Sequence, residues 1–343
     1  MKVSIGYKNI EGPWGGGLNF SKQLIKYLEK KNISVVSDLS SNDIDIILLT
    51  EPRRFTQSSS FTHLDVLNYM NNNEDTIVIN RINECDERKD TKGLNKFLIN
   101  TSMVADHTVF ISDWLKDLFS NQGFIKENNS VIHNGADKDF FYKNNEALQQ
   151  KKFRIVTHHW GANSNKGIKT YAKLDNLLED SKFNEKFEFI YIGNMPKNVE
   201  LKNTKVIEPM NHTTLSKFLR TCDIYITGSE NEPAGMHHIE GAMSGLPILY
   251  LKSGGITEYC KDYGLDYEIN NLREKISEIT LNYKYYREKL EDYKFTGENM
   301  CKNYFNLFEN LLSKKEEILK NREKVKKLHL KNQYKIAHKY LYF

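Results

Sequence analysis

The alternation of short β-rich runs with helical patterns restricts the fold of this sequence more than any other feature. Alternation of this kind is typical of α/β proteins in which helices cover both faces of a parallel sheet. Segments such as Phe20–Lys30 and Thr214–Cys222 carry apolar residues three and four positions apart, as helices with one buried face do. The predicted strands are Val3–Tyr7, Ile33–Val36, Ile46–Thr50, Thr76–Asn80, Thr108–Ser112, Val131–Ile132, Phe153–Thr157, Phe187–Ile192, Val206–Ile207, Ile224–Thr227 and Pro247–Tyr250.

The length of the chain and a polar segment near its centre predict two doubly wound sheets. A chain of 343 residues is too long for one small core and fits two domains of ordinary size. Residues 143–152 are polar and suit a linker. We therefore expect a first domain over residues 1–142, a second domain over 153–300, and C-terminal helices over 301–343. Two such domains predict a ligand cleft between them.

Composition excludes several classes of protein. Charged residues make up 27% of the chain and hydrophobic residues 39%, which favours a soluble globular protein over a disordered one. The net charge of +4 is too small to indicate nucleic acid binding. No run approaches the roughly 20 apolar residues of a membrane span, and the N-terminus lacks the apolar region of a signal peptide. The four cysteines are scattered, which disfavours disulfides and a structural zinc site. A cytoplasmic location is the expectation.

Two glutamates eight residues apart, Glu232 and Glu240, mark the segment with the most chemical information. The apolar run Asp223–Thr227 before them predicts a buried strand, and a helical pattern around Glu240 stops at Gly245 and Pro247. Glu232 therefore follows the carboxyl end of a strand, which is where ligands bind to open parallel sheets.

The loop between the two glutamates predicts an anion site. Backbone N–H groups of Gly235, Met236 and His237 stand at the N-terminus of the predicted helix, where they suit a phosphate or diphosphate. Glu232 and Glu240 flank that site and are placed to accept hydrogen bonds from sugar or ribose hydroxyls.

A glycine-rich loop follows the first predicted strand. Residues Glu11–Leu18 contain Gly15, Gly16 and Gly17, which let the backbone approach a ligand closely. The loop opens a helix, so it suits a phosphate or an acceptor oxygen. Its spacing is not Gly-x-Gly-x-x-Gly, which disfavours a nicotinamide-dependent enzyme.

These segments resemble the retaining GT-B glycosyltransferases, in particular glycosyltransferase family 4. Glu232 and Glu240 resemble the Glu-x7-Glu signature of these enzymes, and Glu240–Pro247 resembles the family's Glu-Ala-Met-Ala-x-Gly-x-Pro run. Two earlier segments, Ala105–Leu115 and Val131–Asp137, also resemble family motifs. The matches follow the family's order from Gly15 to Pro247.

The resemblance implies a cation for the donor diphosphate. Lys166 and Gly167 resemble the end of the family's Gly-Arg-x-x-x-x-Lys-Gly loop, in which the arginine and lysine neutralise the diphosphate. The arginine of that loop is absent here. The candidates for its place are one of the histidines His158 and His159, Asn163, or Arg81 reaching from the first domain.

Arg81 lies in a polar run, Asn80–Glu87, after a predicted strand of the first domain. Family members often place a histidine near this point, close to the reacting sugar. We expect Arg81 to bind phosphate or acceptor through its planar guanidinium. A salt-bridged loop is the alternative interpretation.

By resemblance, the protein is expected to be a GT-B hexosyltransferase with an acceptor domain, a donor domain and a last helix that crosses back. It would move a sugar from a UDP- or GDP-linked donor to an acceptor hydroxyl with retention, without metal or cofactor. Glu232 would hold the sugar and Glu240 the ribose, while Gly16 and Gly17 line the opposite wall. The acceptor is expected to be a glycan, a lipid-linked molecule or a protein, in polysaccharide, glycan or glycolipid synthesis. A GT-B nucleotide-sugar epimerase and a non-catalytic sugar-nucleotide-binding subunit are the alternatives.

The C-terminal segment is helical in pattern and basic. Phe305, Leu307, Phe308, Leu311 and Leu312 form an apolar stripe that predicts a core-facing helix. Residues 314–343 hold ten Lys or Arg against three Glu. A solvated terminal helix is one interpretation, and an amphipathic helix on an anionic membrane surface is another. Nucleic acid is not an expected partner, because no recognition motif accompanies the charge.

Overall fold

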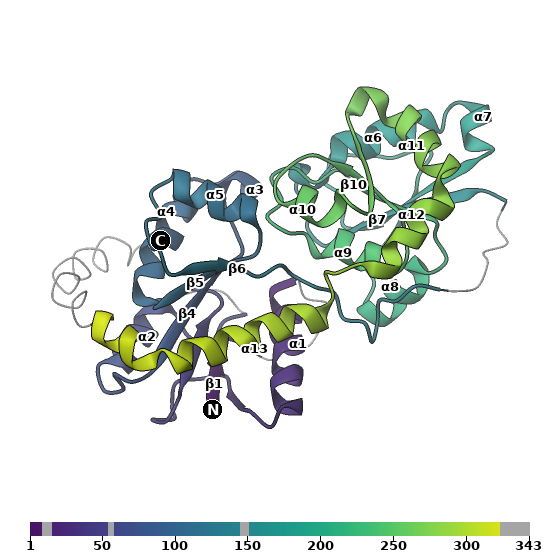
Figure 1. Ribbon diagram of the computed structural model, residues 1–343. Coiled ribbons are helices and arrows are strands. Elements are labelled where there is room, and N and C mark those ends of the chain that lie inside the picture. The colour runs from purple at the N-terminus through teal and green to yellow at the C-terminus, as the bar shows by residue number, and fades with distance from the viewer. Residues whose placement is uncertain (9–15, 54–57, 145–150, 323–343) are drawn as a thin grey trace.

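The computed structural model describes residues 1–8, 16–53, 58–144 and 151–322. These residues form two six-stranded sheets, each flanked by helices, and all strand pairs are parallel. The two sheets belong to two bodies that follow one another along the chain (Figure 1). The prediction of two doubly wound parallel sheets is confirmed.

The first sheet has the order β2-β1-β3-β4-β5-β6. Its central strands are buried on both faces, which explains why they are nearly continuous apolar runs. The bounds are β1 Lys2–Ile5, β2 Ser34–Val36, β3 Ile46–Leu49, β4 Ile77–Ile82, β5 His107–Phe110 and β6 Asn129–Val131. Its helices are α1 Gly16–Lys30, α2 His63–Met70, α3 Asp86–Lys89, α4 Leu94–Thr101 and α5 Asp113–Asn121.

The second sheet has the order β12-β11-β10-β7-β8-β9, which is the strand order of the dinucleotide-binding fold. The bounds are β7 Phe153–His159, β8 Phe187–Gly193, β9 Lys205–Ile207, β10 Ile224–Thr227, β11 Ile248–Leu251 and β12 Gly264–Tyr267. Its helices are α6 Ile168–Leu177, α7 Ser181–Asn184, α8 His212–Leu219, α9 Met236–Met243, α10 Ile256–Cys260, α11 Leu272–Leu281 and α12 Tyr283–Lys289.

Every strand that the sequence predicts has a counterpart, with ends that shift by a few residues. The sequence did not predict β12. This strand is short, contains Gly264 and Asp266, and exists because its backbone pairs with β11 at the edge of the sheet. Pattern alone does not distinguish such a strand from a loop.

The strand order places the ligand edges of the two sheets opposite each other. In the second sheet the order reverses between β7 and β10, so the loops after these strands open into one crevice. In the first sheet the reversal lies between β1 and β3, and α1 begins at this edge. The interdomain cleft lies between these two edges.

Two crossing segments connect the domains. The chain leaves the first domain through residues 132–144 and returns through the last helix, α13 Gly297–Ser313. The crossings touch, because Ala136 and Thr296 form a parallel bridge and the Gly297 N–H donates to the Ala136 carbonyl at 2.7 Å. A side chain at Gly135 would lie 2.1 Å from the Thr296 oxygen, so only glycine permits this approach.

Helix α13 returns to the first domain and lies beside α1 (Figure 1). The rings of Phe20 and Tyr304 lie 5.0 Å apart in this contact. Of the predicted apolar stripe, Phe308 and Leu311 are buried, while Phe305, Leu307 and Leu312 are partly buried against the same core. The burial of this face explains why the last helix crosses back.

The described chain ends on the first domain. The Arg322 guanidinium pairs with the Asp106 carboxylate and donates to the carbonyls of Glu74 and Thr76, each at 2.8 Å. Most of the basic tail, residues 323–343, lies outside the described residues, and with it most of the segment for which a membrane-surface helix is one interpretation. Within the described part of the chain, no helix is long and apolar enough to cross a membrane.

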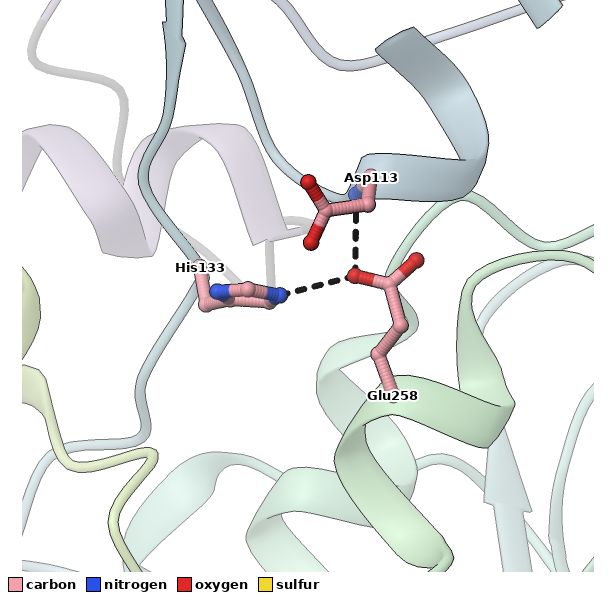
Figure 2. A group of neighbouring side chains, drawn as sticks. All are labelled: Asp113, His133 and Glu258. Atoms are coloured by element: carbon pink, nitrogen blue, oxygen red, sulfur yellow. Dashed lines mark hydrogen bonds and ion pairs between the residues drawn. The ribbon is translucent and has the colours of Figure 1, made fainter. Parts of the chain in front are cut away.

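A polar contact ties the domains together beside the cleft. Glu258 of α10 accepts the Asp113 backbone N–H at 2.9 Å and pairs with the His133 ring at 2.8 Å (Figure 2). Glu258 also accepts the Trp114 backbone N–H at 2.7 Å. Burial raises the pKa of Glu258, but the hydrogen bonds from His133 and the α5 N-terminus hold it below its ordinary value. An acidic residue of the second domain therefore caps a helix of the first.

Candidate active site

A cleft of about 700 Å³ separates the two domains, which is a volume typical of small-molecule sites. Every residue that the sequence assigns to the site lines this cleft. The set comprises Gly16, Gly17, Arg81, His158, Asn163, Lys166, Glu232, Gly235, Met236, His237 and Glu240. The roles assigned to them stay predictions.

Glu232 lines the cleft and lies in the loop that follows β10. One carboxylate oxygen, Oε2, accepts from Lys166 Nζ at 2.5 Å. The other, Oε1, forms an ion pair with Arg88 Nε at 2.8 Å. The Glu232 side chain is only 5% exposed, so both cations meet it in a largely dry environment. Each pair is therefore stronger than a surface ion pair.

These contacts set the ionisation of Glu232. Burial alone would raise its pKa, but Arg88 and Lys166 outweigh burial and lower the pKa to about 2. Glu232 is thus a carboxylate at neutral pH. Burial lowers the pKa of Lys166, and Glu232 opposes that shift. An anion that entered beside Lys166 would favour its charged form further.

Glu240 is held by histidines from two other segments. His158 Nε2 lies 2.8 Å from Glu240 Oε2, and the Tyr225 hydroxyl lies 3.1 Å from His158 Nδ1. His212 Nε2 lies 4.0 Å from the other oxygen of Glu240. Burial would raise the pKa of Glu240, but the His158 contact lowers it. Both ring nitrogens of His158 are engaged, so His158 orients Glu240 and is not a free cation for a phosphate.

The N-terminus of α9 opens into the cleft, with Gly235 before its first residue. The first backbone N–H groups of a helix have no partner within it, so they are available to an anion. A Cβ at Gly235 would lie 2.4 Å from His237 Cε1 and 3.1 Å from Glu232 Cγ. Only glycine lets the helix end and Glu232 approach so closely.

The glycine loop of the first domain meets this helix end. A Cβ at Gly16 would lie 2.7 Å from the Met236 side chain. Gly16 and Gly17 begin α1, so two helix N-termini face one cleft from opposite domains. Residues 9–15, which hold the rest of the predicted loop, lie outside the described residues.

Arg81 stands in β4 of the first domain and is almost fully buried. Its Nη2 donates to Asn134 Oδ1 at 2.9 Å, and its guanidinium carbon lies 4.0 Å from the centre of the Phe20 ring. Among the described residues, Nε and Nη1 are buried without an aligned hydrogen-bond partner, although the Tyr304 hydroxyl lies close to the guanidinium. An arginine keeps its charge when buried, so these N–H groups are able to donate to an anion.

Sequence reasoning missed Arg88, which lies in α3 just after the predicted polar run Asn80–Glu87. Besides its pair with Glu232, Arg88 Nη1 donates to Glu84 Oε2 at 2.6 Å, and Lys89 Nζ lies 3.2 Å from the same oxygen. With all groups ionised, three cations (Arg88, Lys89 and Lys166) surround two carboxylates, which leaves one positive charge in excess. The density of charged residues after a first-domain strand was the available signal.

A cluster of buried histidines, His159, His237 and His238, lies beside the site. His237 Nε2 lies 2.8 Å from Thr227 Oγ1, and His159 Nε2 lies 2.6 Å from the Tyr171 hydroxyl. Both rings are neutral, because burial holds the pKa of each well below its ordinary value. His238 is fully buried, and burial lowers its pKa to about 3. Neither of its ring nitrogens has a hydrogen-bond partner in the described part of the chain.

Comparison with known protein families finds a match in the second domain. A model of the family described as glycosyl transferases group 1 matches residues 163–296, a range that contains Lys166, Glu232 and Glu240. No curated protein matches the sequence significantly.

Solved structures resemble the whole fold. Sucrose-phosphate synthase from Thermosynechococcus elongatus superposes with a TM-score of 0.66 at 12% identity, over 91% of this chain and 99% of that one. Anabaena HepE in complex with UDP-glucose gives 0.65 at 14% identity, over 91% and 100%. A glycosyltransferase from Rickettsia africae gives 0.62 at 14%, over 91% and 98%. The chain therefore has the GT-B fold, and residues 163–296 in its second domain match the model of the glycosyl transferases group 1 family.

Proposed function

We propose that this protein is a retaining, metal-independent hexosyltransferase that moves a sugar from a UDP- or GDP-linked donor to an acceptor hydroxyl. The observation that carries the proposal is the pair formed by Lys166 and Glu232 at the N-terminus of α9, inside the interdomain cleft. A fixed cation and a helix N-terminus side by side suit a diphosphate, while an ionised carboxylate beside them suits sugar hydroxyls.

The donor would lie along the second domain. The amides of Gly235, Met236 and His237, together with Lys166, would bind the diphosphate. Glu240 would accept hydrogen bonds from the ribose, and its contact with His158 would fix its orientation. Glu232 would hold the sugar hydroxyls. Because Glu232 precedes α9 and Glu240 lies within it, the sugar and the ribose would bind on opposite sides of the diphosphate.

The acceptor would approach from the first domain. Gly16 and Gly17 form a helix N-terminus without side chains, and Arg81 offers buried N–H donors that lack an aligned partner among the described residues. A phosphate or another anionic group on the acceptor, or on the donor, would satisfy Arg81. The acceptor class is a glycan, a lipid-linked molecule or a protein, in polysaccharide, glycan or glycolipid synthesis. For a lipid-linked acceptor, the basic C-terminal tail is the proposed contact with anionic membrane.

The chemistry needs groups that the cleft contains. The bond between the anomeric carbon and the diphosphate oxygen breaks, and its electron pair leaves with the nucleoside diphosphate. The acceptor oxygen bonds to the anomeric carbon on the face that the leaving group vacates, and the acceptor proton passes to the departing diphosphate. Positive charge held at the diphosphate lowers the barrier, because negative charge grows there in the transition state.

Structural neighbours support the nature of the ligand. Anabaena HepE has been crystallised with UDP-glucose, with UDP, and with UDP and glucose. The present chain shares that fold, and cations and helix N-termini line its cleft. On these grounds we infer a nucleotide-sugar donor for this chain as well.

A panel of nucleotide sugars tests the proposal. Thermal shift with UDP-glucose, UDP-N-acetylglucosamine, GDP-mannose and ADP-glucose identifies the base, because a ligand at 100 times its Kd stabilises the native state by about 2.7 kcal/mol. Slow donor hydrolysis, followed by NMR of the product anomer with and without EDTA, then tests transfer, retention and metal independence. Interconversion of two nucleotide sugars would indicate an epimerase, and binding without turnover would indicate a non-catalytic subunit.

A further inference from the structure

The donor domain supplies only part of the positive charge that a diphosphate needs. Lys166 is the lysine of the family-like loop, and the arginine that accompanies it in that loop is absent from this sequence. The four candidates for its place have other surroundings in the structure. His158 is bound to Glu240 and Tyr225, and His159 is a buried neutral ring bound to Tyr171. Asn163 is neutral, and Arg81 lies against Phe20 and Asn134.

Arg88 meets the geometric requirements for that place. Its Nε lies 2.8 Å from Glu232 Oε1, while Lys166 Nζ lies 2.5 Å from Glu232 Oε2. The two cations therefore flank one carboxylate, and both line the cleft. The Nε–H of Arg88 is buried and has no aligned hydrogen-bond acceptor, although Glu232 is close. A guanidinium has five N–H donors, so Arg88 can pair with Glu232 and Glu84 and still donate to an incoming oxygen.

The backbone around Arg88 is fixed by both domains. The Asp86 carboxylate accepts the backbone N–H groups of Gly93, Leu94 and Asn95, which makes the α3–α4 turn rigid. From the second domain, Asn165 Nδ2 donates to the Arg88 carbonyl at 3.2 Å. Arg88 is therefore pre-positioned over the donor site when the cleft is closed.

The balance of charges around Glu232 indicates the role of Arg88. Both oxygens of Glu232 pair with cations and keep lone pairs for a sugar hydroxyl. The cluster around Glu232 and Glu84 has one positive charge in excess, which a diphosphate beside the α9 N-terminus would neutralise. On the basis of the proposed function, we propose that Arg88 is a catalytic residue that binds the donor diphosphate across the cleft and replaces the missing arginine.

This arrangement couples catalysis to domain closure. As the anomeric C–O bond breaks, its electron pair moves to the diphosphate oxygen, and Arg88 and Lys166 share the new charge. Because Arg88 belongs to the first domain, the full set of cations exists only when the two domains meet. With the cleft open, the nucleotide would contact the second domain alone, and cleavage of the bond between the sugar and the diphosphate would be slow.

Calorimetry on Arg88→Met and Arg88→Lys tests the proposal, with Arg273→Met as control. Arg273 forms an exposed ion pair with Asp180 outside the cleft. The probes are the nucleoside diphosphate that the wild-type protein prefers, UDP or GDP, and the matching monophosphate. Arg88→Met should weaken diphosphate binding at least tenfold, change monophosphate binding less than threefold, and lower kcat by about 100-fold, as for loss of one fixed donor. Arg88→Lys should recover part of both losses, because lysine keeps the positive charge but lacks the planar guanidinium with its several N–H donors.

Each other result has a distinct meaning. Unchanged diphosphate affinity in Arg88→Met, with weaker nucleotide-sugar binding alone, would mean that Arg88 only orients Glu232 and would overturn the proposal. Tighter donor binding together with faster turnover would show that Arg88 only holds Glu232 in the protein without ligand. That result would also overturn the proposal. A wild-type protein that binds no nucleoside diphosphate would overturn the proposed function itself, and the role of Arg88 with it.

Discussion

Replacing Glu232 by Gln is the sharpest perturbation of this site, because it removes one charge and few atoms. The carboxylate is the shared counter-ion of two buried cations, Arg88 and Lys166. The amide of Gln keeps the shape but cannot neutralise either cation. Removing one partner of a buried pair is strongly destabilising, since the remaining charge is left uncompensated.

The pKa of Glu232 gives the size of the effect. The surrounding charges lower it from 4.5 to about 2, and each unit corresponds to about 1.4 kcal/mol of preference for the ionised form. Glu232→Gln should therefore lower the free energy of unfolding by about 3 kcal/mol at pH 7. A lowered carboxyl pKa stabilises the fold above the unfolded value and loses that effect as pH falls through the folded value. The difference between the two proteins should narrow as pH falls from 4.5 towards 2.

Ligand binding should respond in the opposite direction. Without Glu232, Arg88 and Lys166 are free to meet a diphosphate. Glu232→Gln should therefore bind UDP or GDP about tenfold more tightly, a change of about 1.4 kcal/mol. Turnover should fall, because the sugar loses the carboxylate that positions it. Tighter product binding together with slower transfer is a pattern that general damage to the fold would not produce.

Urea unfolding and calorimetry at pH 7 measure both effects on the same samples. Glu230→Gln is the matched control, because Glu230 lies on the same loop and pairs with the exposed Lys169 at 3.7 Å. Such a surface change should alter stability by less than about 0.5 kcal/mol. A Glu232→Gln protein as stable as the control, with unchanged diphosphate affinity, would refute the idea that Glu232 neutralises these cations.

Three further predictions concern other parts of the molecule. Lys166→Ala should reduce kcat/KM on the preferred donor by about 2–4 kcal/mol of transition-state stabilisation, with partial rescue in Lys166→Arg, and unchanged steady-state kinetics would contradict its role. His238 has a pKa of about 3 when folded against 6.5 when unfolded, so only the unfolded chain takes up its proton as pH falls below 6.5. The wild-type protein should thus lose about 2 kcal/mol through this residue between pH 7 and pH 5, and urea unfolding of His238→Phe should lack that loss. Glu258→Gln should weaken the contact with His133 and loosen the domains, seen as faster limited proteolysis and an increased radius of gyration by small-angle scattering; an unchanged radius would argue against the contact as a clamp.

Local patterns of the sequence were sufficient to predict the architecture and most of the site. Buried parallel strands need continuous apolar runs, and the helices between them need one apolar face, so both kinds of element leave a readable period. The loop from Glu232 to Glu240 was equally readable, because its glycines, its glutamates and the following helix lie within one short stretch of chain. All the residues predicted for the site do meet in one cleft.

Tertiary structure alone decided which charges act on one another. Arg88 is an ordinary helix arginine in the sequence, and it reaches Glu232 only because the cleft brings α3 against the loop after β10. In the same way, the sequence makes His158 a candidate phosphate ligand, but the fold places His158 against Glu240. The strength of an ion pair depends on the distance between the two charges in space, and not on their separation along the chain. A sequence therefore shows which charged residues exist, and the packing of the two domains determines their partners.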